Sequence, residues 1–193
     1  MKSSTLGRPR DEEIDLFVLE TVRKHLAIHG LNGLSISSIA AESQTTRASI
    51  YRRWPNKLSL ALAAISDLAE KDPPIPTDDP LNDLESELAH FRKCINDASS
   101  QALVGVMLQD GVDPEFKKQY RKLLVEPRRA RILACLERGI LLKKIPATAD
   151  VALIASFATG SWYSISVAGN PHPKDWAKRT ATAMWNACGA RPL

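Results

Sequence analysis

Four cationic side chains fall within the thirteen residues from Thr45 to Lys57, a stretch that contains no acid. They are Arg47, Arg52, Arg53 and Lys57. The guanidinium fork of arginine fits the edge of guanine and the oxygens of a phosphate, and nearby hydroxyls can bind either partner. These residue types at this spacing therefore indicate a surface that binds nucleic acid. Judged on charge alone, the alternative is a helix face whose arginines are only solvated.

A short helix must position these cations. The hydroxyls of Thr45 and Thr46 can cap its first turn and Pro55 ends it, which leaves barely two turns. So short a helix buries one face, and we expect Ala48 and Ile50 to point inward. The residues left on or near its surface are then Arg47, Ser49, Tyr51, Arg52 and Arg53.

Two further helices are predicted before the basic one. Residues 34–42 begin with a capping Ser35 and repeat apolar residues at helical spacing. Only a three-residue connection, 43–45, separates them from the basic helix, which predicts a helix-turn-helix. Residues 11–30 form a long amphipathic helix, and residues 56–71 form a fourth. This arrangement would present the third helix to a groove of DNA.

A resemblance to the helix-turn-helix of the TetR family of transcriptional regulators runs through LSISSIAAESQTTRASIYRRWPNKLSL, residues 34–60. The positions that carry it are Ser35, Ile36, Ile39, Ala40, Thr46, Ala48, Ser49, Ile50, Tyr51, Trp54 and Lys57. At the turn, Ser43, Gln44 and Thr45 stand in place of the family's Ala-Gly-Val. Either Gln44 takes the left-handed conformation of that glycine, at a cost of about 1 to 2 kcal/mol, or the turn is reshaped.

The resemblance implies that one face of the third helix meets DNA through Thr46, Arg47, Ala48, Ser49, Tyr51, Arg52 and Arg53. It also implies that Ser35 and Ser37 donate to one phosphate and Lys57 to another. Arg47 is the expected base reader, because the N-terminal end of the reading helix penetrates deepest. Arg52 and Arg53 are expected to hold the DNA backbone.

Residues 1–10 form a basic arm. Its Gly7-Arg8-Pro9-Arg10 segment is similar to the core of a minor-groove AT-hook, in which proline keeps the chain extended so that the flanking arginines enter a narrow groove. Arg8 and Arg10 are therefore candidate DNA contacts. The alternative is a disordered solubilising tail.

The composition fits a globular protein whose hydrophobic core is large enough to fold without disulfides or a structural metal. The 193 residues are 44% hydrophobic and carry a formal net charge of +4, which permits nucleic-acid binding. Cys94, Cys135 and Cys188 are expected to be reduced, buried thiols. His25 and His29 have the spacing of a zinc pair but no third ligand, so no metal or cofactor is expected. The sequence shows neither a membrane span nor a signal peptide, which predicts a cytoplasmic protein with no membrane partner.

Four prolines in residues 72–80 mark a rigid linker between two domains. We place a DNA-binding domain at residues 11–71, with its helix-turn-helix at about 34–53, and a regulatory and dimerisation domain at residues 81–193. The second domain shows only helical periodicity, with helices expected at 81–99, 102–110, 113–139, 149–168 and 175–188. The expected fold class is all-α.

The last two predicted helices carry more than one apolar face and many small residues. One face can pack on the core of the subunit and the other on a second copy of the chain. The TetR resemblance likewise implies a homodimer through these helices, with two reading helices about one turn of a palindromic DNA operator apart. The residues expected at the interface are Ala155, Ala158, Trp162, Ile165, Ala177, Ala181, Met184 and Trp185.

The resemblance also implies a pocket in the second domain for a small-molecule effector whose binding releases DNA. The candidate walls suit an apolar or aromatic effector and are Phe91, Cys94, Met107, Phe116, Tyr120, Leu124, Phe157 and Trp162. The alternative is that these residues, at helical spacing, fill the core.

Two other classes of protein compete with a regulator. A small helical enzyme would need a nucleophile elbow, a phosphate loop or a metal cluster; the sequence offers none, and no catalytic residue is expected. A non-specific architectural DNA-binding protein would spread its cations over a broad face, whereas here they concentrate on one short helix. We therefore predict a homodimeric repressor that a small ligand releases from its operator, with repression implied by the resemblance alone.

Overall fold

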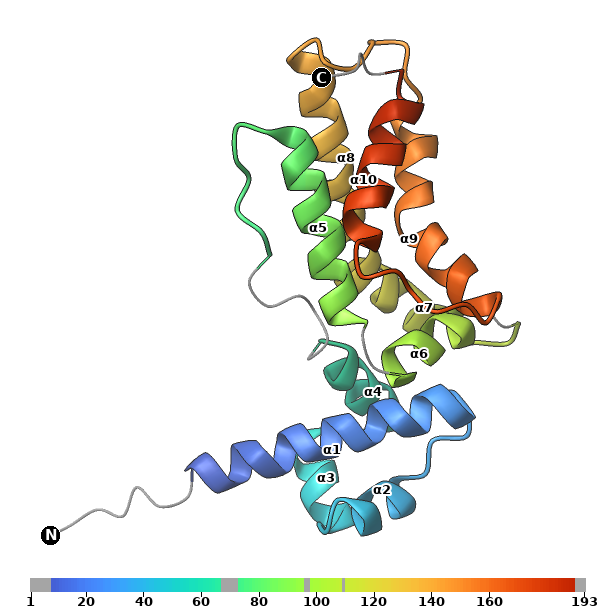
Figure 1. Cartoon of the computed structure of the whole chain (residues 1–193). Coiled ribbons are helices and arrows are strands. Elements are labelled where there is room, and N and C mark those ends of the chain that lie inside the picture. Colours follow the sequence, from blue (N-terminus) through green and yellow to red (C-terminus); the bar gives the residue numbers. More distant parts are fainter. Residues whose placement is uncertain (1–7, 67–72, 96–97, 109, 190–193) are drawn as a thin grey trace, which may run out of the picture. The chain divides into compact units, whose positions relative to one another are not determined.

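The structure is a computed structural model that describes residues 8–66, 73–95, 98–108 and 110–189, with the side chains of residues 8–12 and 98–102 outside the description. Within these ranges the regular elements are all helices, as Figure 1 shows. Their bounds are α1 (Arg8–His29), α2 (Ile36–Glu42), α3 (Arg47–Arg53), α4 (Lys57–Ser66), α5 (Pro80–Cys94), α6 (Ala98–Leu108), α7 (Pro114–Tyr120), a π-helical turn (Arg121–Val125), α8 (Glu126–Leu141), α9 (Val151–Val167) and α10 (Trp176–Ala187). The expected all-α fold is confirmed.

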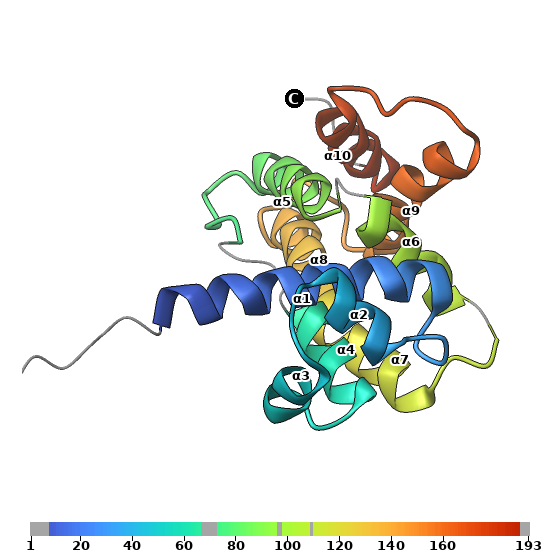
Figure 2. The same cartoon turned by 90° about the horizontal axis from the view of Figure 1, so that it is seen from below.

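The first of two compact units contains α1 to α4 together with α6 and α7. Helix α1 packs against α2, α4 and α6, and Figure 2 shows α2 beside both α1 and α3. The core of this first unit contains the buried side chains of Val22, Leu26 and Ile50. Leu103 of α6 and Phe116 of α7 are buried in the same core, although the sequence-based division places both in the second domain.

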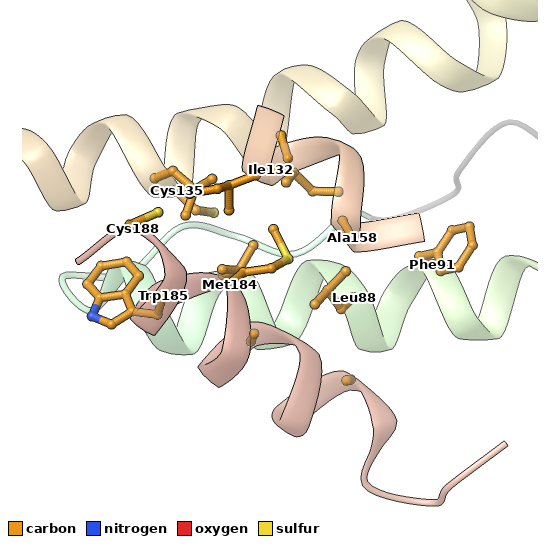
Figure 3. Close-up of a cluster of buried hydrophobic side chains, with 14 of the residues drawn as sticks. Leu88, Phe91, Ile132, Cys135, Ala158, Met184, Trp185 and Cys188 are labelled. Carbon is orange, nitrogen blue, oxygen red and sulfur yellow. The ribbon is translucent and has the colours of Figure 1, made fainter. Parts of the chain in front are cut away.

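The second unit contains α5, α8, α9 and α10. Helix α5 packs against α8 and α10, and α9 packs against both of these as well. Figure 3 shows side chains from all four helices meeting in one apolar cluster, among them Leu88, Cys135, Ala158 and Met184. This packing therefore decides which side chains of the four helices are buried and which stay exposed to solvent.

The three cysteines are free thiols, and the predicted burial holds for two of them. Cys135 and Cys188 are buried and Cys94 is half-buried. Burial raises the pKa of all three thiols, to about 12 for Cys135. A thiol that keeps its proton is a weak nucleophile, which fits a packing role.

Helix α1 begins at Arg8, earlier than the predicted start at residue 11. Pro9 thus lies in the first helical turn, where its missing amide hydrogen removes no hydrogen bond. The expectation of an extended segment at Arg8-Pro9-Arg10 is corrected accordingly. Gly7 and the rest of the arm, residues 1–7, lie outside the described residues, as do the side chains of Arg8 and Arg10.

A π-helical turn interrupts the single helix that the sequence predicts over residues 113–139. Asp113 caps the start of α7 by accepting from the amide of Phe116 over 2.9 Å, and Pro114 occupies the first turn, as expected. The turn at Arg121–Val125 comes just before Pro127. Proline has no amide hydrogen to donate to the carbonyl four residues back, so the helix changes its hydrogen bonding there.

The described part of the linker, residues 73–79, is not helical and is fastened to the second unit. The amide and hydroxyl of Thr77 donate to the carboxylate of Asp83 over 2.7 to 3.0 Å. Arg138 donates to Asp83 and to the carbonyl of Thr77. Asp79 then caps α5 by accepting from the amide of Leu81 over 3.1 Å.

Candidate nucleic-acid interface

Hydroxyl caps fix the start of both helices of the predicted motif. At α2, Oγ of Ser35 accepts from the amide of Ser38 over 3.3 Å. At α3, Oγ1 of Thr46 accepts from the amide of Ser49 over 3.1 Å. The caps satisfy amides that the first turn of a helix leaves unpaired, and both were predicted from the sequence.

The turn between α2 and α3 is held in a left-handed conformation. Gln44 has a φ of 50°. The amide of Thr45 donates to the carbonyl of Ala40 over 2.9 Å, and the amide of Gln44 donates to the carbonyl of Ala41 over 3.3 Å. The first of the two expected conformations is therefore the one observed: Gln44 adopts the left-handed conformation of the family's glycine. A residue with a Cβ is strained there by about 1 to 2 kcal/mol.

Helix α3 is anchored through one buried side chain and exposes four others. Ile50 is the buried residue among its seven. Arg47, Ala48, Tyr51 and Arg52 are exposed. The expectation that Ala48 points inward is wrong, because two residues along a helix turn the side chain to the opposite side from Ile50.

Arg53 faces α1. Its Nε lies 2.8 Å from Oδ1 of Asp15 on α1, and its Nη1 donates to Oγ of Ser49 over 2.8 Å. The Arg53 side chain is 19% exposed, whereas the preceding Arg52 is exposed. Arg53 thus braces the C-terminal end of α3 against α1.

Helix α1 also contacts the end of α2. Nε2 of His25 lies 3.0 Å from Oε2 of Glu42, the last residue of α2. His25 and His29 meet edge to face with ring centroids 5.8 Å apart. The His25 side chain therefore links α1 to α2, and the two imidazole rings pack against each other.

Lys57 is exposed at the first position of α4. A reciprocal pair caps this helix: the amide of Ser59 donates to Oδ1 of Asn56 over 2.8 Å, and the amide of Asn56 donates to Oγ of Ser59 over 3.1 Å. Ser37 is exposed in the first turn of α2. The starts of α2 and α4 thus offer a hydroxyl and an ammonium group for a phosphate.

The structure brings most of the predicted DNA contacts together on α2, α3 and the start of α4. They are Ser35, Ser37, Thr46, Arg47, Ala48, Ser49, Tyr51, Arg52 and Lys57. Arg47, Arg52 and Lys57 supply exposed positive charge, and the group contains no acid. Such a set offers guanidinium forks and hydroxyls to base edges and phosphates.

The eight predicted pocket walls do not form one set. Met107, Phe116, Tyr120 and Leu124 belong to the core of the first unit. Phe91 and Trp162 are buried in the core of the second, Cys94 is half-buried beside His90, and Phe157 is 49% exposed. Six of the eight therefore take part in core packing, and the structure does not join the eight into one pocket.

The predicted dimer residues are corrected because most of them are buried within their own subunit. Those in the core of the second unit are Ala155, Ala158, Trp162, Ala177, Ala181, Met184 and Trp185, with Ile165 packed partly buried against it. A second copy cannot cover side chains that are already covered. The outward apolar residues of α9 are instead Leu153, Phe157 and Val167, which are 55%, 49% and 89% exposed.

A groove of about 520 Å³ lies between α9 and α10. Its lining is mainly apolar and includes Phe157, Ile165, Ala183 and Ala187, with Arg179 as its charged member. Of the predicted pocket walls, Phe157 is the one that lines this groove.

Among the described residues, no helix is long and apolar enough to cross a membrane. No group of three or more His, Cys, Asp or Glu side chains in those ranges is placed to hold a metal ion.

A capped helix-turn-helix that exposes arginines on its second helix is the reading head of a DNA-binding protein. Residues 18–64 match the family described as "Bacterial regulatory proteins, tetR family". Residues 74–184, more than half of the chain, match "Tetracyclin repressor-like, C-terminal domain". The chain belongs to the TetR family of bacterial transcriptional regulators, which confirms the resemblance and the predicted regulatory function. This is a family of regulators and not of enzymes.

Individual proteins with similar sequences are also described as transcriptional regulators. YdeS of Bacillus subtilis strain 168, an uncharacterized HTH-type transcriptional regulator, is 22% identical over 169 residues, which cover 86% of this chain and 85% of YdeS. Rv1556 of Mycobacterium tuberculosis strain H37Rv, also an uncharacterized HTH-type transcriptional regulator, is 36% identical over 56 residues, which cover 29% of this chain and 26% of Rv1556.

Solved structures show the same fold. MexZ, a key repressor responsible for antibiotic resistance in Pseudomonas aeruginosa, superposes with a TM-score of 0.71 at 18% identity, over 93% of this chain and 94% of MexZ. HlyIIR, a hemolysin II transcriptional regulator, superposes with a TM-score of 0.64 at 15% identity, over 90% of this chain and 97% of HlyIIR.

Proposed function

We propose that the protein is a homodimeric repressor that binds a palindromic DNA operator and leaves it when a small-molecule effector binds. The observation that carries this proposal is the exposed face of α3, where Arg47, Tyr51 and Arg52 stand out from a helix that Ile50 anchors. The description of MexZ as a repressor favours repression over activation. The site of action is the cytoplasm, where bacterial DNA lies.

Each cation of the head has a proposed role. Arg47 lies at the N-terminal end of α3, the end that enters a major groove, and reads a guanine edge with its fork. Arg52 and Lys57 bind phosphates, which position the head without reading sequence. Arg8 and Arg10, in the first turn of α1, add positive charge that attracts the DNA backbone.

The dimer is proposed to form through the outward apolar residues of α9 and the groove between α9 and α10. Leu153, Phe157 and Val167 are large apolar side chains exposed on one helix. The groove beside them is lined by the small residues Ala183 and Ala187, which allow a helix of a second copy to approach closely. A two-fold axis at this surface pairs two reading heads.

The effector is proposed to be an apolar or aromatic molecule that carries a hydrogen-bond acceptor. Trp162 is 4% exposed, and its indole N–H has no acceptor in the part of the chain that the structure describes. Its ring stacks on that of His172 with centroids 3.5 Å apart. A buried donor left unpaired costs about 1 to 3 kcal/mol, which an acceptor on a ligand can recover.

Selection of bound sequences from random duplex DNA by the purified protein, at about physiological salt, tests the proposal. We expect an enriched palindrome with half-sites about one helical turn apart. An enriched site without two-fold symmetry would contradict the dimer, and the absence of any enriched sequence would favour the architectural alternative.

The effector is tested on the operator found in this way. Acceptor-bearing aromatic compounds are screened for release of the wild-type protein, and each hit is repeated with Trp162→Phe, which keeps a ring and removes the N–H. We expect this variant to bind the operator normally and to respond only weakly. An undiminished response would remove Trp162 from the effector site.

A further inference from the structure

We infer that Arg53 is a positioning residue and not a DNA contact. It ties the reading helix to α1 through Asp15, and it fixes the hydroxyl of Ser49 as a hydrogen-bond donor toward DNA. The inference rests on the proposed recognition face of α3, and it replaces the expectation that Arg53 holds the DNA backbone.

The geometry engages one guanidinium with two partners at once. Nε of Arg53 lies 2.8 Å from Oδ1 of Asp15, and Nη1 donates to Oγ of Ser49 over 2.8 Å. The side chains of Arg53 and Asp15 are 19% and 33% exposed, so water screens the ion pair only in part. Because the guanidinium is planar and rigid, one ion pair and one hydrogen bond made by the same group set its orientation as well as its distance.

Helix α3 needs such a brace because its apolar anchoring is slight. It has seven residues, and Ile50 is the buried one. A single apolar contact holds a helix close to its neighbour but leaves rotation about the helix axis weakly defined. Arg53 stands three positions after Ile50, on the same side, and fixes that rotation through α1. The direction in which Arg47 leaves the other end of α3 depends on it.

The contact with Arg53 also decides what Ser49 can offer to DNA. A serine hydroxyl has one hydrogen to donate and two acceptor sites. Arg53 occupies one acceptor site, and within the described ranges the Ser49 hydroxyl makes no other hydrogen bond. Its hydrogen remains to be donated, and the adjacent positive charge strengthens it as a donor. The group that Ser49 meets is therefore an acceptor: a phosphate oxygen, a purine N7, guanine O6 or thymine O4.

The test measures how operator affinity depends on salt, using the operator that the wild-type protein selects. Arg53→Gln removes the charge and the brace together. Arg53→Lys keeps the charge but cannot hold two partners in one plane. Lys57→Gln is the matched control, because it removes one exposed cation that is proposed to bind a phosphate. Thermal unfolding of each variant confirms that the head is folded.

We expect both Arg53 variants to bind about 10-fold more weakly and to keep the salt slope of the wild type, with a changed preference at the operator bases. Lys57→Gln should flatten the slope by about 0.9 and leave the preference unchanged. If Arg53→Gln flattens the slope as Lys57→Gln does while Arg53→Lys retains it, Arg53 is a phosphate contact and the inference is overturned.

Two double variants give an independent measure. Asp15→Asn should weaken binding, and Asp15→Asn with Arg53→Gln should be no weaker than Arg53→Gln alone, because both changes break one contact. Ser49→Ala should show the same non-additivity with Arg53→Gln. Tighter binding by Asp15→Asn would mean that Asp15 withholds Arg53 from DNA, which contradicts the brace. A wild-type protein without any sequence preference would instead refute the proposed function.

Discussion

Arg138 on α8 donates through Nη1 to Oδ2 of Asp83 on α5 over 2.6 Å, and the Asp83 side chain is 6% exposed. Burial alone raises the pKa of Asp83, but the hydrogen bonds from Thr77 and Arg138, with the charge of Arg138, outweigh it and hold the pKa below its ordinary value. One buried carboxylate thereby joins α5, α8 and the linker.

Arg138→Met is expected to destabilise the second unit by about 3 kcal/mol, because it leaves a buried carboxylate without its cation. Stability from Asp83 is present above its unfolded pKa of about 3.9 and is lost as pH falls through the lower folded value. The variant keeps the hydrogen bonds from Thr77 but loses those from Arg138, so its acid dependence should be smaller. Urea unfolding at about pH 7 and about pH 3 measures both. Lys178→Met, at an exposed position of α10, is the control and should change stability by less than about 0.5 kcal/mol.

Glu87, buried on α5 with Arg131 3.0 Å from its carboxylate, should make stability fall with rising pH. Burial raises its pKa to about 7, against about 4.3 in an unfolded chain. The folded state therefore binds the extra proton between these values, and that stability, complete below about pH 4, is lost as pH rises through about 7.

In Glu87→Gln the side chain stays neutral, so the variant should not show this dependence of stability on pH. The unfolding free energy that the wild type loses is on the order of 3 kcal/mol, because one pKa unit corresponds to about 1.4 kcal/mol. Unfolding free energies at about pH 5 and about pH 8 measure it, with Glu85→Gln on the same helix as control. An equal difference between wild type and Glu87→Gln at both pH values would show that Glu87 stays charged beside Arg131.

Gln44→Gly is expected to stabilise the first unit by about 1 kcal/mol, because glycine adopts a φ of 50° without the strain that a Cβ causes. Gln44→Ala is the matched control, since it shortens the side chain but keeps the Cβ, and it should give no such gain. Thermal unfolding compares the three proteins. A gain of the same size from alanine would assign the effect to the glutamine side chain instead.

Arg47→Ala should cost about 1 to 3 kcal/mol of operator binding and relax the preference at one base in each half-site. Lys57→Ala should weaken binding evenly across sequences and flatten the salt slope by about one unit. Binding measured on single-base variants of the operator separates the two effects. An unchanged sequence profile for Arg47→Ala would remove that residue from base reading.

Phe157→Glu should give a folded monomer with much weaker operator binding, because it places a charge on the proposed interface. Its neighbour Ala158, which is fully buried, is the contrasting position, and Ala158→Glu should unfold the second unit. Sedimentation and circular dichroism distinguish the outcomes. An intact dimer of Phe157→Glu would place the interface elsewhere.

Local patterns in the sequence were enough to predict the reading head. Ser35 and Thr46 cap their helices as predicted, because a cap depends on the hydroxyl residue and on amides within three positions of it. The sequence left two conformations open for the turn at Gln44, and the structure shows that it is left-handed. The class of regulator could be inferred from these few residues.

Contacts between distant parts of the chain decided the rest. Periodicity showed that α9 is apolar on more than one side, but only packing against α5, α8 and α10 turned Ala158 inward and left Phe157 outside. Arg53 is a second example: its charge predicts a DNA contact, and only the fold places Asp15 beside it. The sequence by itself determined the helices, their caps and the family, because those depend on neighbours along the chain. Which faces are buried and which cations remain for DNA was decided by tertiary structure, because burial and pairing depend on residues that only folding brings together.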